Sequence, residues 1–410
     1  MSAGAFEELQ AALGKRRVAI GPPARKLWSR ELAPQVTVLP ESASELGLAL
    51  EAARKEGLRV AVCGAGSRLG AREARRLGGQ ELALLDLREL SGPIEIRPAS
   101  LWMAARAGTP VAELFERAAR MACRPVGLEE SDPGTLGGFL SSAASMPDRI
   151  LGIPQPPVLA LEAVLPSGKV IRSLASPRAA TGPDVFSLLL GTGGAFGVIC
   201  SALVKLEPLP ERRLLIGFRF PGLERALAAV RWTVSRGLPP AACSVVADGE
   251  AGRRKVRLWV RFEGQARLSA HATRAFQAEA ERLGGKLQEL DQVRDWEAEL
   301  AAWRAELAAP VRWSELTRAL RAADRLPDGG YARAVLDRPE PTGCRLRLEP
   351  AGKLDAAGRK AWQAGLDPDG AQAAAVDAAR SRLAAVRAEL DPQGLLNPQS
   401  WPLAWPGGAA

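Results

Sequence analysis

The stretch CGAGSRLG, residues 63–70, is a glycine-rich loop that follows a predicted strand at residues 58–62. Glycine lets the main chain approach anionic oxygens closely, so such a loop can direct backbone N–H groups at a pyrophosphate. The loop nearly matches the GxGxxG dinucleotide fingerprint, with Asp86 at a suitable distance for its acid, but Leu69 occupies the third glycine position. Two interpretations of this loop alone therefore stay open: a phosphate-binding loop, and a tight turn without a ligand.

The residues before this loop predict a β-α-β start. Residues 35–39 alternate as a strand, and Ser42 with Glu45 three residues on has the spacing of a capping box. Residues 46–55 then show the apolar repeat of a helix, and Gly57 follows as a C-cap glycine would. The glycine-rich loop thus comes after the second strand of this unit, whereas the dinucleotide fingerprint follows the first.

Four further segments follow the loop in a fixed order. They are DPGTLGG (132–138), LEAVLPSGKVI (161–171), GPDVFSLLLGTGGAFGVI (182–199) and DPQGLLNP (391–398). The second of them predicts a hairpin with its turn at residues 166–169. The third contains most of an uncharged run at residues 185–204, which is long enough to span a bilayer. Its glycines between residues 191 and 197 are typical of a buried turn instead, so we expect no transmembrane segment.

The second half of the chain changes character at about residue 211. Alternating strands and helical repeats are predicted there at residues 213–220, 223–236, 255–262 and 268–283. This mixture indicates a second, α+β domain. A helix rich in Trp, Glu and Ala is expected over residues 295–325, and a last helix over residues 374–390.

The composition of the 410 residues excludes several classes of protein, and the length predicts two domains. The 55 basic residues are interleaved with 46 acidic ones, so the net charge of +9 marks no nucleic-acid-binding face. Five separated cysteines without a CxxC pair give no zinc ribbon or iron–sulfur site, and the single histidine, His271, gives no two-histidine metal site. We therefore expect no metal site and no nucleic-acid partner, with His271 as an ordinary surface residue of a helix.

Taken in order, the five motif segments resemble the FAD-linked oxidases of the vanillyl-alcohol oxidase/PCMH flavoprotein superfamily. The branch that they resemble most is that of the glycolate oxidase FAD-binding subunit and the related D-2-hydroxyacid dehydrogenases. The resemblance implies an α+β fold. It consists of a PCMH-type two-subdomain FAD-binding domain at residues 1–210 and an α+β cap domain, an antiparallel sheet with flanking helices, at residues 211–375. A C-terminal segment at residues 376–410 would return to the FAD-binding domain.

The resemblance also implies which residues hold the cofactor. The first pyrophosphate loop would consist of Gly64, Ala65, Gly66, Ser67 and Arg68. The second would consist of Pro133, Gly134, Thr135, Gly137 and Gly138, with Ser141 after it. Ile199 would offer backbone polar groups to the edge of the flavin ring, and Asn397 would stand in the family's C-terminal Asn-Pro. We expect noncovalent FAD, because the first loop lacks the histidine to which the family attaches its flavin.

The sequence departs from the family's pattern in two places: at residues expected beside the flavin ring, and in the groups that hydroxyacid oxidation needs. The family's Asn-Ala-Gly-Gly after the second loop is replaced by residues 143–146, Ala-Ala-Ser-Met. Oxidation of a hydroxyacid needs a base for the hydroxyl proton and a cation for the carboxylate. The chain offers Glu263 or Glu315 as bases, and as cations the arginines Arg257, Arg261, Arg345 and Arg347. Because no histidine cluster is present, we expect little turnover by the isolated chain.

Two hypotheses about function follow from the resemblance. In the first, the chain is the FAD-binding subunit of a glycolate oxidase-like 2-hydroxyacid oxidoreductase, and electrons pass from the flavin to a partner. In the second, it is a catalytically degenerate paralogue that supports a separate catalytic flavosubunit. The resemblance implies a second FAD-type subunit and an iron–sulfur subunit as partners. We expect a cytoplasmic protein, peripheral at the membrane only through these partner subunits.

Overall fold

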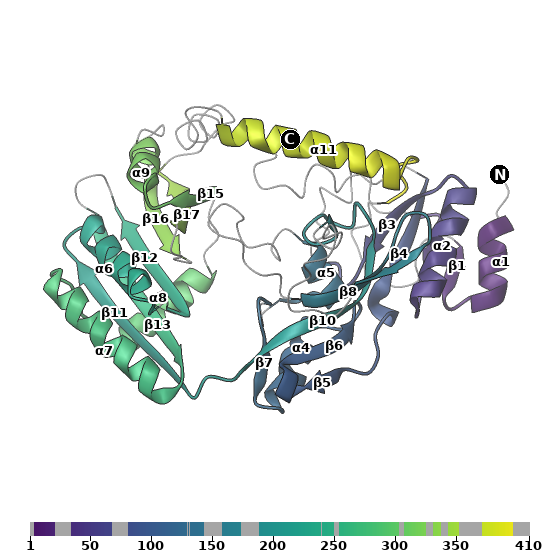
Figure 1. Ribbon diagram of the computed structural model, residues 1–410. Helices are drawn as coiled ribbons and strands as arrows, with labels where there is room; N and C mark the ends of the chain where they lie inside the picture. Colours follow the sequence, from purple (N-terminus) through teal and green to yellow (C-terminus); the bar gives the residue numbers. More distant parts are fainter. Residues whose placement is uncertain are drawn as a thin grey trace. The chain divides into compact units, whose positions relative to one another are not determined.

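The computed structural model describes residues 4–20, 34–67, 81–128, 130, 132–142, 158–173, 188–238, 240–249, 254–302, 307–324, 331–337, 343–351 and 371–396. These residues form two compact units, whose elements are labelled in Figure 1. The first unit contains the described residues up to 209 and from 377 on, and the second contains those from 210 to 376. Along the described residues, the chain therefore passes to the second unit at residue 210 and returns to the first at residue 377.

A four-stranded sheet forms the N-terminal part of the first unit. Its elements are α1 (Gly4–Leu13), β1 (Val18–Ile20), β2 (Val36–Val38), α2 (Ala43–Lys55), β3 (Arg59–Cys63) and β4 (Leu82–Asp86). The strands lie in the order β1-β2-β4-β3, with β4 parallel to both β2 and β3. The predicted start of α2 is confirmed, because the Glu45 N–H donates to Ser42 Oγ at 3.2 Å. Its predicted end is confirmed as well, since Gly57 follows α2 with a φ of +69°.

A second, antiparallel sheet forms the other part of the first unit. Its elements are β5 (Glu95–Arg97), β6 (Trp102–Arg106), α4 (Val111–Ala119), β7 (Cys123–Pro125), α5 (Leu136–Ser141), β8 (Val158–Val164), β9 (Val170–Arg172) and β10 (Val198–Pro208). The strands lie in the order β5-β6-β10-β8-β9, and β7 pairs with the end of β10. The predicted hairpin is confirmed by the pairing of Val164 with Val170 across β8 and β9.

The uncharged run at residues 185–204 is a turn and a strand in its described part. Residues 188–197 form the turn, and β10 begins at Val198, which is buried together with Ile199. This confirms the interpretation of the glycines as a buried turn. Among the helices in the described parts of the chain, none combines the length and the apolar character that a bilayer crossing needs.

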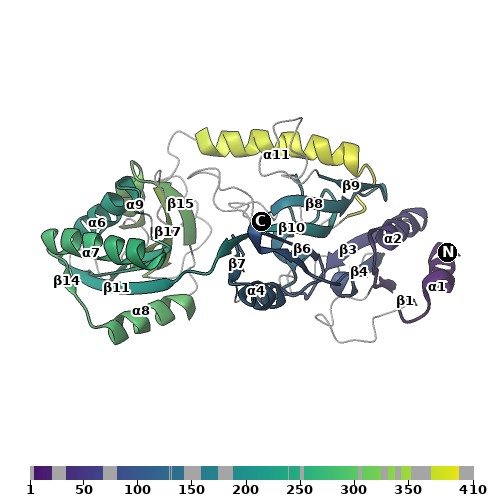
Figure 2. The same cartoon turned by 60° about the horizontal axis from the view of Figure 1, so that its bottom comes forward.

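An antiparallel sheet with helices on both faces forms the second unit, as Figure 2 shows for the labelled elements. The strands are β11 (Arg212–Phe220), β12 (Ala242–Asp248), β13 (Lys255–Gly264), β14 (Lys286–Leu287), β15 (Leu307–Arg312), β16 (Tyr331–Asp337) and β17 (Gly343–Pro350), in the order β14-β11-β13-β12-β16-β17-β15. The helices are α6 (Leu223–Ser235), α7 (Ala266–Arg282), α8 (Leu290–Ala302) and α9 (Leu316–Asp324). The predicted antiparallel sheet with flanking helices is confirmed.

The two faces of this sheet differ in chemistry. Phe262 of β13 belongs to the main core of the unit, where its ring packs against Phe276 of α7. Trp259, three residues earlier in β13, belongs to a smaller core on the opposite face, beneath α8. Because side chains alternate along a strand, Arg257 and Arg261 share the face of Trp259 and α8.

The helix expected over residues 295–325 is wrong in its middle. Residues 290–302 and 316–324 are helical, but Leu307–Arg312 forms β15 and pairs with β17. Pro310 explains the interruption, because proline lacks the N–H that a helix interior requires. A strand at the edge of a sheet tolerates proline, and β15 is the last strand of the order.

The chain returns to the first unit through α11 (Ala371–Leu390). Leu383, Val386 and Leu390 of this helix pack against the core of the second sheet of the first unit. The residues after α11 then reach strand β3, where Leu396 forms a parallel bridge with Val60. The return of residues 377–396 to this unit therefore brings the C-terminal segment beside the strand that leads into the glycine-rich loop.

Candidate functional site

A cavity in the first unit lies between the end of β3, helix α5 and the turn before β10. It offers about 400 Å³ of empty space, a volume that includes open solvent at its mouth. Six residues expected from the sequence line it: Gly64, Thr135, Gly137, Gly138, Ser141 and Ile199. Three segments that are far apart in the sequence thus meet at one place.

The other expected site residues have separate positions. Ala65, Gly66 and Ser67 continue the loop that starts at Gly64, and Pro133 and Gly134 precede Thr135. Arg68 and Asn397 lie outside the described residues. The walls also include residues absent from the expected set: Val62, Cys63, Leu87, Ala107, Gly193, Gly194, Gly197 and Val198. The glycine-rich turn at residues 191–197 is the sequence signal that could have added three of them.

The loop Gly64 to Ser67 presents uncommitted backbone N–H groups. None of its four N–H groups donates to any acceptor in the described parts of the chain. Gly66 has a φ of +79°, a conformation that side-chain-bearing residues rarely adopt. Gly64 lies against α5, so closely that a Cβ there would overlap Thr135 Oγ1 and stand 3.1 Å from Thr135 Cβ. The loop therefore combines close packing with N–H groups that remain available to an anion.

The turn that begins α5 uses its N–H groups within the fold. The Gly134 N–H donates to Asp132 Oδ1 at 2.7 Å, and the Leu136 N–H donates to the Thr109 carbonyl at 2.9 Å. The Gly137 N–H donates to the Ala107 carbonyl at 2.9 Å. Gly137 is also pressed against that residue, since a Cβ there would lie 2.7 Å from the Ala107 Cβ. These contacts give the turn a structural role that the sequence alone does not indicate.

The turn before β10 closes the other side of the cavity. Gly191, Gly193 and Gly194 have φ values of +71°, +64° and +75°, so this backbone path favours glycine. The Gly193 N–H donates to the Ser141 carbonyl at 2.7 Å, and the Gly191 N–H donates to the Leu140 carbonyl at 2.9 Å. These two bonds tie the turn to the end of α5, so Gly193 and Gly194 reach the cavity wall.

The charges nearest the cavity are held away from it. Asp86, the acid that the dinucleotide fingerprint would direct to a ribose, is buried and accepts hydrogen bonds from the Arg88 Nε at 2.9 Å and Nη2 at 2.6 Å. Burial, reinforced by the charge of Asp86, raises the pKa of the Cys63 thiol well above its usual value. Cys63 is therefore a neutral wall residue rather than a thiolate nucleophile. Because Asp86 is bonded to Arg88, its carboxylate is not free to bind a ribose, and the dinucleotide interpretation of the loop is not supported.

The geometry fits a diphosphate better than a cationic or metal-bound ligand. Glycine, apolar and hydroxyl groups make up the described lining, without a charged side chain. Anions are commonly bound by backbone N–H groups, and those of the loop Gly64 to Ser67 have no acceptor in the described parts of the chain. Thr135 and Ser141 add hydroxyl-bearing residues to the lining.

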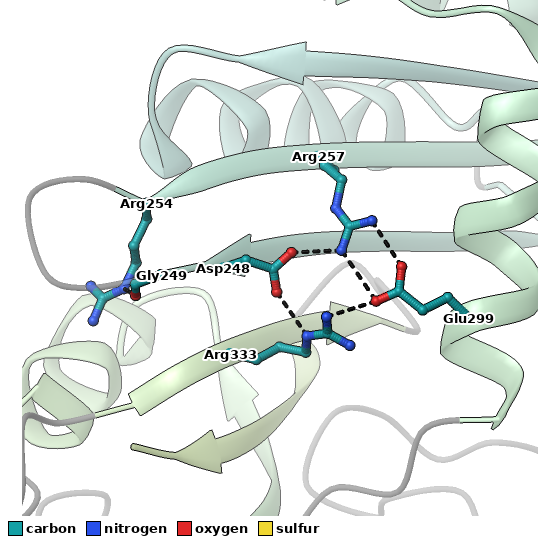
Figure 3. Close-up of polar contacts among 6 residues, drawn as sticks. All are labelled: Asp248, Gly249, Arg254, Arg257, Glu299 and Arg333. Carbon is teal, nitrogen blue, oxygen red and sulfur yellow. Dashed lines mark hydrogen bonds and ion pairs between the residues drawn. The ribbon is translucent and has the colours of Figure 1, made fainter.

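Arg257, a candidate cation of the second unit, and its neighbour Arg333 are already paired with carboxylates. Arg257 lies 2.5 Å from Asp248 Oδ2 and 2.9 Å from Glu299 Oε2, and Arg333 lies 2.7 Å from an oxygen of each (Figure 3). Burial alone would lower the Arg257 pKa, but the hydrogen bond to Glu299 and the charge of Asp248 outweigh it and raise that pKa. The hydrogen bond from Arg257 in turn lowers the pKa of Glu299. Two guanidinium groups and two carboxylates thus form a closed ring of alternating charge.

The remaining candidates for catalysis are similarly placed. Arg261 lies 2.6 Å from Glu297 Oε1 of α8 and 2.8 Å from Glu263 Oε1. Glu263, a candidate base, is therefore held in an ion pair, and Glu315 faces Arg318 at 3.8 Å. Arg347 on β17 has partners of its own, and the side chain of Arg345 lies outside the described residues. His271 is exposed on α7, which confirms its prediction as a surface helix residue.

Comparison with known proteins agrees with the geometry of the cavity. Residues 34–173 match the family model of a FAD binding domain. Alkyldihydroxyacetonephosphate synthase of Caenorhabditis elegans is 27% identical over 212 residues, which are 51% of this chain and 35% of that protein. D-lactate dehydrogenase of Archaeoglobus fulgidus is 25% identical over 241 residues, which are 57% of this chain and 53% of that protein. The chain thus spans about a third to a half of the length of these curated relatives.

Likeness to solved structures extends over both units. The structure of p-cresol methylhydroxylase with substrate bound matches with a TM-score of 0.65 and 13% identity, covering 96% of this chain and 95% of that one. This likeness confirms the predicted fold of a PCMH-type FAD-binding domain with a cap domain. The family match confirms FAD as the expected cofactor. Residues 34–173 therefore match a FAD binding domain, and the fold of the chain is similar to that of p-cresol methylhydroxylase.

Proposed function

We propose that the chain is the FAD-binding subunit of a glycolate oxidase-like oxidoreductase that acts on a 2-hydroxyacid. The observation that carries this proposal is the cavity, which is lined by glycines and by Gly64, the first residue of a loop whose N–H groups have no acceptor in the described parts of the chain. The FAD binding domain match and the D-lactate dehydrogenases among the relatives support the cofactor and the substrate class. In this proposal, electrons pass from the flavin to a second FAD-type subunit and an iron–sulfur subunit.

The residues of the first unit would divide the work of holding the cofactor. The N–H groups of Gly64 to Ser67 would bind the diphosphate, and Thr135 and Ser141 would offer hydroxyls in the lining of the cavity. Gly193, Gly194 and the backbone at Ile199 would form the wall at the flavin ring. FAD, when bound, supplies the acceptor for the hydride that leaves the substrate carbon. Arg68 would add a cation to the loop, as its place in the motif suggests.

A second candidate function is favoured by the pairing of the arginines. A carboxylate substrate needs a cation that is not already neutralised. Arg257 and Arg261 both hold glutamates of α8, so neither is poised to clamp a substrate in this conformation. We therefore keep the alternative of a catalytically degenerate FAD scaffold that stabilises a separate catalytic flavosubunit.

One experiment separates these functions. The visible spectrum of the purified chain reports bound flavin, and dye reduction with glycolate or D-lactate reports turnover. A catalytic subunit should carry flavin and reduce the dye once its partner subunits are added, with the rate falling when its own loop is mutated. A scaffold should leave the rate of the assembled complex unchanged when its flavin loop is mutated. A chain that cannot be loaded with flavin contradicts the FAD-binding role in both.

A further inference from the structure

The turn after α11 fixes the C-terminal segment to the strand that carries the cofactor loop. We propose that Asp391 and Arg387 are positioning residues for FAD, which hold β3 and hence the loop Gly64 to Ser67 in register for the diphosphate. The inference rests on the proposed role of that loop. It adds a function for two residues that lie more than 300 positions away from the loop in the sequence.

Asp391 organises the turn with both of its carboxylate oxygens. It is 5% exposed, and its Oδ1 accepts the Leu395 N–H at 2.8 Å while its Oδ2 accepts the Leu396 N–H at 3.0 Å. The Gly394 N–H donates to the Asp391 carbonyl at 3.0 Å, and Gly394 has a φ of +63°. A buried carboxylate that accepts two backbone N–H groups makes charge-assisted bonds, which are stronger than neutral ones. The path of Leu395 and Leu396 is therefore set by Asp391.

The same two leucines attach to β3 and to α11. The Val60 N–H donates to the Leu395 carbonyl at 2.8 Å, and Leu396 forms a parallel bridge with Val60. The Arg387 Nη2 donates to the Leu396 carbonyl at 2.8 Å. Burial lowers the pKa of Arg387, and the charge of Asp391 opposes this effect. Leu395 and Leu396 are thus hydrogen-bonded to Asp391, Arg387 and Val60.

This attachment covers an edge of the sheet that is next to the cofactor loop. Strand β3 pairs with β4 on one side and is the last strand of the order β1-β2-β4-β3. The C-terminal segment pairs with its other side at Val60, three residues before β3 ends at Cys63. Gly64 follows at once and lies so close to Thr135 that a Cβ there would overlap Thr135 Oγ1. The segment attached at Val60 therefore borders a strand whose end packs closely against the residue before α5.

The test compares two carboxylates that bind backbone N–H groups: Asp391, whose turn attaches to Val60 of β3, and Glu56, whose partners lie in α1. Asp391→Asn removes the negative charge of the carboxylate that accepts the Leu395 and Leu396 N–H groups. Glu56→Gln is the matched control, because Glu56 Oε1 accepts the N–H groups of Ala5 at 2.8 Å and Phe6 at 3.0 Å, before β3 begins. FAD affinity of the apo chain is measured by flavin fluorescence, and hydrogen exchange is measured at the Val60 amide. Arg387→Gln is the second variant, in case Asp391→Asn does not fold.

We expect Asp391→Asn to raise the FAD Kd roughly 10–100-fold, the scale of losing a charge-assisted hydrogen bond. Exchange at Val60 should accelerate in the same variant, and Arg387→Gln should show both effects more weakly. Glu56→Gln should leave the Kd and the Val60 exchange near the wild-type values. Faster exchange at Val60 with an unchanged FAD Kd in both Asp391→Asn and Arg387→Gln would overturn the positioning role alone. A wild-type chain that binds no FAD would overturn the proposed function as well.

Discussion

Adding one methyl group at Gly64 should weaken FAD binding through a single contact. In Gly64→Ala, the new Cβ would overlap Thr135 Oγ1 and stand 3.1 Å from Thr135 Cβ. Thr135 is 4% exposed and caps α5, since the Gly138 N–H donates to its Oγ1, so it has little freedom to turn away. Overpacking of this kind costs about 1–3 kcal/mol. The same displacement moves the N–H groups of the loop, so the FAD Kd should rise together with the loss of stability.

A double-mutant cycle tests this reasoning. Thr135→Ala removes the overlapping oxygen at a cost of about 1 kcal/mol for the lost cap. In that background Gly64→Ala should cost less, with a coupling free energy of about 1–2 kcal/mol in urea unfolding of the apo chain. Gly222→Ala is the control, because a Cβ there would meet nothing within 4 Å. The steric account is refuted if Gly64→Ala is as mild as this control, or equally costly with and without Thr135.

Three further predictions follow from the charges and thiols. Acid precipitation should leave the flavin in the supernatant, because the Cys63 thiol is buried with a raised pKa and no histidine stands in the loop; flavin in the protein pellet would contradict this. His271→Ala should leave the activity of an assembled complex within about twofold, since this residue is exposed on α7; loss of activity would reverse that assignment. Glu299→Gln should lower the Tm at neutral pH. Arg257 holds the Glu299 pKa below its usual value, so the stabilisation exists above the unfolded pKa and the difference should shrink below about pH 4; a difference independent of pH would contradict the pairing.

The features that the sequence predicted well have local causes. The start of α2 at Ser42 and the hairpin between Val164 and Val170 depend on residues a few positions apart. The turn before β10 was recognisable because its glycines interrupt an uncharged run. The β15 interruption was missed although its cause, Pro310, is also local, because the Ala- and Glu-rich residues around it favour a helix.

The features that the sequence could not predict depend on contacts between distant segments. Nothing near Arg257 indicates that Glu299, 42 positions away, will neutralise it. Alternation along β13 predicts that its arginines share a face but not which helix covers that face. In the same way, the motif DPQGLLNP does not show that Asp391 attaches Leu395 to Val60. Contacts between segments far apart in the sequence determine each of these three features.

Glycine in this site has three different physical roles, which a motif cannot separate. Gly137 makes room for Ala107, and Gly193 permits a left-handed backbone, yet the N–H groups of both are bonded within the fold. Gly66 also needs a left-handed backbone, but its N–H remains uncommitted among the described residues. Of these three glycines, only Gly66 leaves its N–H as a donor for a phosphate among the described residues. The fate of the N–H group, rather than the number of glycines, therefore distinguishes Gly66 of the loop that we propose for the diphosphate from Gly137 and Gly193, which support the site.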